Sequence, residues 1–133
     1  MAALIDSSVL IAGERGQINL ADLLVALGGE PLALSAVTAS ELLYGLHRAQ
    51  TRAQRVRRNA YLEAIFAQMT VLAFDLAVAR VHAAVSAQLD RTGRRVGAHD
   101  LIIAATAIAH DCRVATRDLR SFPKIQGLET VRI

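Results

Sequence analysis

The sequence predicts an α/β domain with a mainly parallel sheet of four to five strands and helices on both faces. Short apolar runs that suit buried strands alternate with longer segments whose apolar residues repeat at helical spacing. Right-handed crossovers between parallel strands place the intervening helices on the two faces of the sheet. The length of 133 residues and the 53% hydrophobic content suit one core. We therefore expect a single domain over residues 1–133.

The first half of the chain predicts two strands and four helices. The strands are expected at residues 2–5 and 31–34, and the helices at residues 7–12, 18–27, 38–49 and 52–69. Gly28 and Gly29 end the second of these helices. Glu41 follows Thr38 by three residues, the spacing of a capping box in which the Glu side chain returns to the N–H group of the cap residue. Glu41 therefore has a purely structural explanation.

The second half predicts a strand at residues 70–74, a helix capped by Asp75, a basic loop at residues 91–95 and a further helix. That helix, residues 97–109, is rich in alanine and almost wholly apolar, which indicates a buried helix. Asp100 lies in its first turn, where negative charge is favoured and where an acid often serves only as a cap. Strands at residues 113–115 and 131–133 complete the expected sheet.

Composition excludes several classes of protein. The single cysteine, Cys112, excludes an internal disulfide and a cysteine-cluster zinc site, and it fits a reducing compartment. Asp6 interrupts the apolar start, so no signal peptide is expected, and no segment is long enough to span a bilayer. We expect a cytoplasmic protein that does not contact a membrane. The net charge of +3, carried by fourteen Arg and only one Lys, permits a nucleic-acid partner without requiring one.

Four carboxylates occupy comparable positions along the chain. Asp6 and Asp118 follow predicted strands, whereas Glu41 and Asp100 lie near the starts of predicted helices. In a parallel sheet the carboxyl ends of the strands and the starts of the following helices share one edge, where functional crevices lie. The four acids should therefore face one crevice.

A cluster of this kind implies a cation. Two unit charges about 4 Å apart repel by about 4 kcal/mol at an effective dielectric constant near 20, so the acids are either partly protonated or bound to a metal. An all-oxygen pocket without cysteine, with at most His99 nearby, suits Mg²⁺ or Mn²⁺ better than Zn²⁺. Such ions activate water and stabilise a leaving oxygen. The basic segments that flank the acids point to a phosphodiester substrate.

Four segments together resemble the PIN-domain ribonucleases, specifically the VapC-type toxins of bacterial and archaeal toxin–antitoxin pairs. They are Ile5-Asp6-Ser7-Ser8-Val9-Leu10, Ser40-Glu41-Leu42-Leu43-Tyr44-Gly45, Ala98-His99-Asp100-Leu101-Ile102-Ile103-Ala104-Ala105, and Ala115-Thr116-Arg117-Asp118 with Phe122. The resemblance covers almost the whole chain. It implies a PIN-like three-layer domain that cleaves single-stranded or loop RNA with Mg²⁺. Asp6 and Asp100 would be the main metal ligands, and Glu41 and Asp118 would complete the catalytic acids.

The resemblance also implies a homodimer and inhibition by a small antitoxin, with which a higher assembly forms. We expect an amphipathic antitoxin helix to dock between the helices at residues 18–27 and 56–69, near Arg52, Arg55 and Arg58. The basic stretch around these arginines is otherwise a solvated helix face or an RNA contact. In one position the chain departs from the family: many relatives carry an acid before the Phe of the last segment, where this chain has Ser121.

Other functions fit the sequence less well. A haloacid dehalogenase-type phosphatase needs a second Asp where Ser8 stands, and a receiver domain needs a Lys for which Lys124 is displaced. The Gly-x-Ser-x-Gly elbow of a serine hydrolase and a phosphate-binding glycine loop are both absent. The remaining alternative is a non-catalytic RNA- or protein-binding module that retains the acidic pocket. Metal-dependent nuclease activity separates it from the enzyme.

Overall fold

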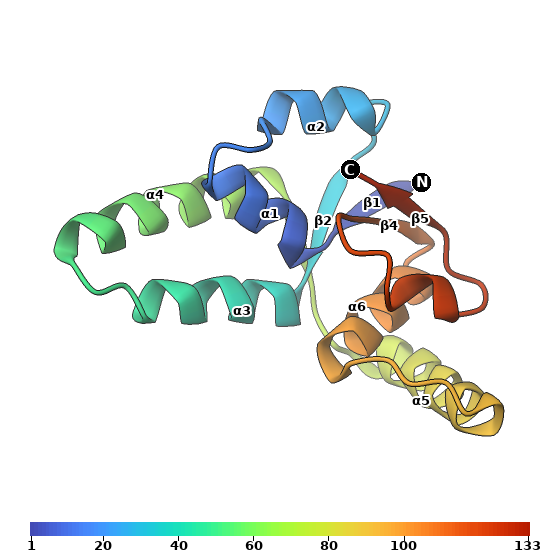
Figure 1. Cartoon of the computed structure of the whole chain (residues 1–133). Helices are drawn as coiled ribbons and strands as arrows, with labels where there is room; N and C mark the ends of the chain where they lie inside the picture. Colours follow the sequence, from blue (N-terminus) through green and yellow to red (C-terminus); the bar gives the residue numbers. More distant parts are fainter.

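The computed structural model describes residues 1–133 and contains one sheet of five strands in the order β3-β2-β1-β4-β5. The strands are β1 (Ala2–Ile5), β2 (Leu32–Ser35), β3 (Thr70–Leu72), β4 (Cys112–Thr116) and β5 (Thr130–Arg132). All neighbouring strands pair in parallel, with Leu4 of β1 opposite Ala33 of β2 and Val114 of β4. The predicted parallel sheet is confirmed, with β1 at its centre (Figure 1).

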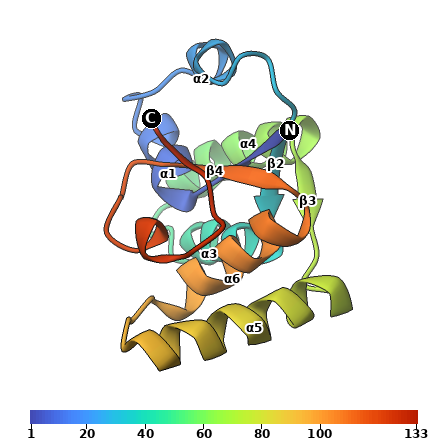
Figure 2. The same ribbon diagram turned by 90° about the vertical axis from the view of Figure 1, so that its right-hand side faces the viewer.

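Helices cover both faces of the sheet (Figures 1 and 2). They are α1 (Ser7–Glu14), α2 (Leu20–Ala26), α3 (Ala36–His47), α4 (Arg52–Gln68), α5 (Leu76–Thr92) and α6 (Ala98–Ala109), followed by the short 3₁₀ helix η1 (Phe122–Lys124). Figure 2 shows α5 outside α6, on the side away from the strands. None of these helices combines the length and the apolar character that crossing a bilayer requires.

The core divides into two clusters because successive strand residues point to opposite faces. Ala3 and Ile5 of β1 pack with residues of α1, α2 and α4. Leu4, between them, packs instead with Ile103 and Ala104 of α6 and with η1. The prediction that residues 97–109 form a buried helix is confirmed, since five of its residues are buried.

The predicted capping box at Thr38 is wrong. Helix α3 begins at Ala36, and its N-cap is Ser35, whose side chain accepts a hydrogen bond from the N–H of Val37. Thr38 is therefore already inside the helix, fully buried, with a hydroxyl that has no partner. Glu41 lies too far into the helix to reach the cap, and its structural explanation no longer holds.

The ends of some other helices and strands differ from their predicted positions by a few residues. Strand β3 ends at Leu72 rather than residue 74, and Phe74 is exposed beyond it. The predicted cap of the following helix is confirmed, because an Oδ1 atom of Asp75 accepts from the N–H of Val78 at 3.0 Å. Val56 of α4 is apolar but 60% exposed.

The groove expected between residues 18–27 and 56–69 is instead formed by α1, α3 and α4. We call it the α1–α4 groove; its lining residues are Ile11, Glu14, Arg15, Glu41, Leu42, Gly45, Arg48, Gln54, Arg57, Arg58, Tyr61 and Leu62. Helix α2 contributes nothing to it, because Leu23 and Leu27 are buried in the core. Arg58 lines the groove and pairs with Glu14 at 3.3 Å, whereas Arg52 and Arg55 do not line it.

Candidate active site

The four predicted site residues gather at the edge of the sheet where β1 and β4 end. Asp6 directly follows β1, and Asp118 lies two residues beyond β4. Glu41 lies in α3 and Asp100 in the first turn of α6. Asp6 and Asp100 act electrostatically on Glu41, and Asp6 and Asp118 act on Asp100. The topology thus brings together carboxylates that are up to 112 positions apart in the sequence.

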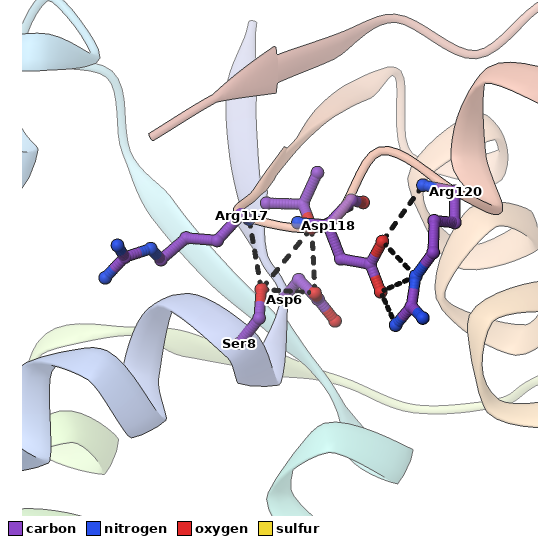
Figure 3. A network of polar contacts seen from close by, with 6 residues as sticks. Asp6, Ser8, Arg117, Asp118 and Arg120 are labelled. Carbon is purple, nitrogen blue, oxygen red and sulfur yellow. Dashed lines mark hydrogen bonds and ion pairs between the residues drawn. The ribbon is translucent and has the colours of Figure 1, made fainter.

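Asp6 is the buried member of this group, with only 5% of its surface exposed. It occupies the N-cap position of α1, yet its side chain makes no capping hydrogen bond. Its Oδ2 atom accepts instead from the hydroxyls of Ser8 at 2.7 Å and Thr116 at 2.9 Å (Figure 3). Two hydroxyl donors on one oxygen fix the orientation of the carboxylate.

The same two hydroxyls also hold the loop after β4. The N–H of Arg117 donates to Ser8 Oγ at 3.1 Å, and the N–H of Asp118 donates to Thr116 Oγ1 at 3.0 Å. Each hydroxyl therefore accepts from the loop and donates to Asp6. This network ties the end of β4 to the carboxylate at the end of β1 (Figure 3).

Glu41 contacts residues from two other elements. Ser7 Oγ lies 3.5 Å from its Oε2 atom, and His99 Nδ1 lies 3.2 Å from its Oε1 atom. Oε1 is buried and has no hydrogen bond of good geometry. Burial raises the pKa of Glu41, and Asp6 and Asp100 raise it further, while His99 lowers it. The carboxylate is thus held in an environment that favours its protonated form.

Asp100 has a similar environment. Burial raises its pKa, the negative charges of Asp6 and Asp118 add to the effect, and the side chains of Ser121 and His99 oppose it. Helix α6 is capped by Gly97 without any side-chain hydrogen bond, so Asp100 lies in the first turn without serving as the cap. Ser121 therefore acts on a site carboxylate.

Asp118 behaves differently from the other three acids. Its carboxylate pairs with the guanidinium of Arg120, whose Nη2 atom lies 2.6 Å from Oδ2 and whose Nε atom lies 2.9 Å from Oδ1. Hydrogen bonds from Arg120 lower the pKa of Asp118 to about 2. Figure 3 shows the carboxylate turned toward Arg120.

The donor chemistry of the edge fits a hard divalent cation. No three acidic, histidine or cysteine side chains are arranged to hold one metal ion as they stand. Mg²⁺ does not need such a cage, since it is usually held by one or two carboxylates, several waters and substrate phosphates. The buried Glu41 Oε1 atom has only the His99 ring as a neighbouring partner, and an oxygen of this kind can also be satisfied by a cation or its water. Asp6 and Asp100 are the carboxylates that would hold such a cation.

Sequence reasoning identified the acids but not the side chains that position them. It missed the roles of Ser8, Thr116, Ser121 and Arg120. Ser8 and Thr116 were visible as short hydroxyl residues within two positions of Asp6 and Asp118. Their pairing across β1 and β4 depends on strand order, which the sequence does not specify residue by residue.

Comparison with known proteins agrees with this geometry. The PIN-domain family matches residues 3–128. Ribonuclease VapC1 of Rickettsia felis is 31% identical over 133 residues, which is 100% of this chain and 97% of that protein. Ribonuclease VapC5 of Mycobacterium tuberculosis is 37% identical over 132 residues, which is 99% of this chain and 93% of that protein.

Solved structures give the same result. VapBC2 from R. felis, bound to a DNA fragment from its promoter, superposes with a TM-score of 0.89 at 18% identity and covers 100% of this chain and 99% of its own, which supports the fold. VapBC-5 from M. tuberculosis has a TM-score of 0.77 at 33% identity, with 100% of both chains covered. The chain therefore belongs to the PIN-domain family and, within it, to the VapC type, as the four sequence segments predicted.

Proposed function

We propose that this chain is an endoribonuclease toxin that hydrolyses RNA phosphodiester bonds with Mg²⁺ or Mn²⁺ and is neutralised by a cognate antitoxin. The observation that carries the proposal is the buried Asp6, held by two hydroxyls at the end of the central strand, with Glu41 and Asp100 in electrostatic range. The relatives named above are ribonucleases by name, and their solved counterparts are VapBC assemblies.

Each acid has a distinct part in the proposed reaction. Asp6 and Asp100 would hold the cation, which would polarise the phosphate and lower the pKa of a bound water. Ser8 and Thr116 hold the Asp6 carboxylate in a fixed orientation through their hydroxyl hydrogen bonds. Glu41, whose pKa is raised chiefly by burial, accepts the proton of the attacking water, because a base works best with a pKa closer to the working pH.

The test is cleavage of single-stranded RNA by the purified chain. We expect cleavage with Mg²⁺ or Mn²⁺ and none with excess chelator. Asp6→Asn should lower the rate by at least about 100-fold, since it removes charge from the cation site. Asp22→Asn, which removes an exposed carboxylate from α2, is the matched control and should cleave normally. Undiminished cleavage in chelator would exclude the role of the cation.

The alternative, a non-catalytic binding module, predicts RNA or antitoxin binding without cleavage under any metal condition. The same assay distinguishes it from the enzyme.

We further propose that the antitoxin places an amphipathic segment in the α1–α4 groove, because that groove combines apolar side chains with arginines and reaches Glu41. Two copies of the chain are expected to pair, as the family resemblance implies.

A further inference from the structure

An open hollow of about 560 Å³ lies beside the acid-lined edge. Its lining residues are Ser8, Arg117, Asp118, Leu119, Arg120 and Arg132. Three arginines and one carboxylate line it, so the hollow has a net positive charge even though it adjoins a group of acids. The Arg120 guanidinium pairs with Asp118, whereas the Arg117 guanidinium extends the other way and donates to Gln17 Oε1 at 3.3 Å (Figure 3). Because Ser8 also donates to Asp6, the hollow begins at the proposed catalytic carboxylate. We call it the arginine hollow.

Within the hollow, one residue engages both oxygens of the Asp118 carboxylate. Oδ1 accepts from the backbone N–H of Arg120 at 3.0 Å and from its Nε at 2.9 Å. Oδ2 accepts from the same Nε at 3.1 Å and from Nη2 at 2.6 Å. Three N–H groups of Arg120 thus compete with any cation for this carboxylate, and Figure 3 shows it turned toward Arg120.

The pairing leaves the far side of the guanidinium free. Of the five N–H donors of an arginine, the Asp118 carboxylate takes those on the Nε side, and the remainder point away from it. The side chain of Arg120 is 87% exposed, so these donors are available to a ligand. The fork of a guanidinium matches two oxygens of a phosphate.

The loop that presents Arg117 and Arg120 is fixed relative to the acids, and the third arginine, Arg132, lies in β5. The N–H groups of Arg117 and Asp118 bind Ser8 and Thr116, the same hydroxyls that hold Asp6. A ligand bound in the hollow therefore lies at a fixed position relative to the proposed catalytic acids.

We propose that the arginine hollow binds the RNA backbone next to the scissile phosphate, and that Asp118 is a positioning residue for Arg120 rather than a ligand of the cation. This inference rests on the proposed ribonuclease function for the identity of the substrate. Charge complementarity favours RNA as the occupant, because three guanidinium groups match a run of phosphates and the hollow opens beside the acids where cleavage would occur.

Binding of a labelled single-stranded RNA in EDTA, by fluorescence anisotropy, tests the hollow without any cleavage. Arg117→Gln, Arg120→Gln and Arg132→Gln should each weaken binding roughly threefold to tenfold and lower the slope of log affinity against log salt by about 0.7. Arg80→Gln, which removes an exposed charge from α5 outside the hollow, is the matched control and should bind like the wild type. Binding by the three variants that equals that of the control, or a wild type that does not bind, would overturn the proposal.

The role of Asp118 is tested with a double-mutant cycle. Asp118→Asn should weaken RNA binding, and adding it to Arg120→Gln should cause no further loss, because both changes remove the same oriented guanidinium. Mg²⁺ binding by calorimetry should be unchanged in Asp118→Asn and lost in Asp100→Asn. Lost Mg²⁺ binding in Asp118→Asn with normal RNA affinity would identify Asp118 as a metal ligand instead.

The outcomes separate the two proposals. RNA affinity that depends on the three arginines, without cleavage under any metal condition, supports the hollow and contradicts the enzyme. Cleavage by the wild type with unchanged rate and affinity in all three arginine variants supports the enzyme and contradicts the hollow.

Discussion

Asp6, Glu41 and Asp100 differ in how the protein holds their carboxylates. Two hydroxyls donate to Asp6 and fix its orientation, whereas burial raises the pKa of Glu41 and of Asp100. Carboxyl groups whose pKa is raised by burial and by neighbouring charges are typical of functional sites. The hydroxyl pair at Asp6 follows from the fold, because β1 and β4 are neighbours and place Ser8 and Thr116 on either side of it.

These pKa shifts predict how stability depends on pH without a divalent cation. An acid whose pKa is higher in the folded protein binds its proton more tightly there, so its protonation stabilises the fold as pH falls and this stability is lost as pH rises through the folded pKa. The raised pKa values of Glu41 and Asp100 therefore predict a melting temperature that rises as pH falls from neutrality toward the ordinary range of carboxylates. Asp118, with its pKa lowered to about 2, acts in the opposite direction only below about pH 4.

Thermal melts in EDTA across this pH range provide the measurement. The Glu41→Gln, Asp100→Asn double variant is the control, and its melting temperature should vary less with pH. Adding Mg²⁺ at neutral pH should raise the melting temperature of the wild type, because a bound cation replaces the missing protons. A wild type and a double variant with the same pH profile would contradict the prediction.

A single substitution at Asp100 distinguishes a catalytic role of this acid from a structural one. Asp100→Asn should abolish RNA cleavage while leaving the melting temperature unchanged or higher, since the side chain makes no capping hydrogen bond and is repelled by Asp6 and Asp118. Loss of a cap would instead cost about 1 kcal/mol of stability and leave activity intact. A melting temperature and a cleavage rate measured on the same preparation decide between the two.

At the scale of elements, the sequence predicted which segments are helices and strands but misplaced some of their ends. Strand and helix periodicity is carried by many apolar residues, so the order of elements was recovered throughout. A helix start depends on one cap residue, and Ser35 and Thr38 are both acceptable caps. The Glu41 spacing favoured Thr38, whereas Thr38 is buried in the fold and Ser35 is the residue that caps.

This assignment of the helix start makes opposite predictions for two substitutions. Ser35→Ala should lower the free energy of unfolding by about 1 kcal/mol, because it removes the hydrogen bond to Val37. Thr38→Val should leave stability unchanged or raise it by up to about 1 kcal/mol, since it replaces a buried, unpartnered hydroxyl. Urea denaturation of the two variants measures both effects. A larger loss in Thr38→Val than in Ser35→Ala would restore Thr38 as the cap.

At the scale of the whole molecule, parallel topology explains why the candidate site was largely predictable. Acids that follow parallel strands or start the next helices share one edge of the sheet, so the sequence predicted the edge on which all four lie. How close they lie along that edge depends on strand order, and here β1 and β4 are neighbours. The pairing of Ser8 with Thr116 and the capture of Asp118 by Arg120 were not predictable. Both interactions depend on which strands are neighbours and on the conformation of a short loop. No periodic pattern of residues in the sequence indicates either of these features.

The sequence also did not show that α2 packs its leucines into the core rather than lining a groove. The surface on which a partner is expected to bind is therefore the α1–α4 groove. The α1–α4 groove is lined by Arg57 but not by Arg55, although both are exposed on α4 and neither has an ion pair in the structure. Arg57→Glu should therefore weaken the complex with the cognate antitoxin roughly tenfold or more, because it replaces a positive charge that the groove offers to the partner with a negative one. Arg55→Glu carries the same change of charge on the same helix and should bind normally. Calorimetric titration with the purified antitoxin makes the comparison, and equal affinities for the two variants would exclude this groove as the docking surface.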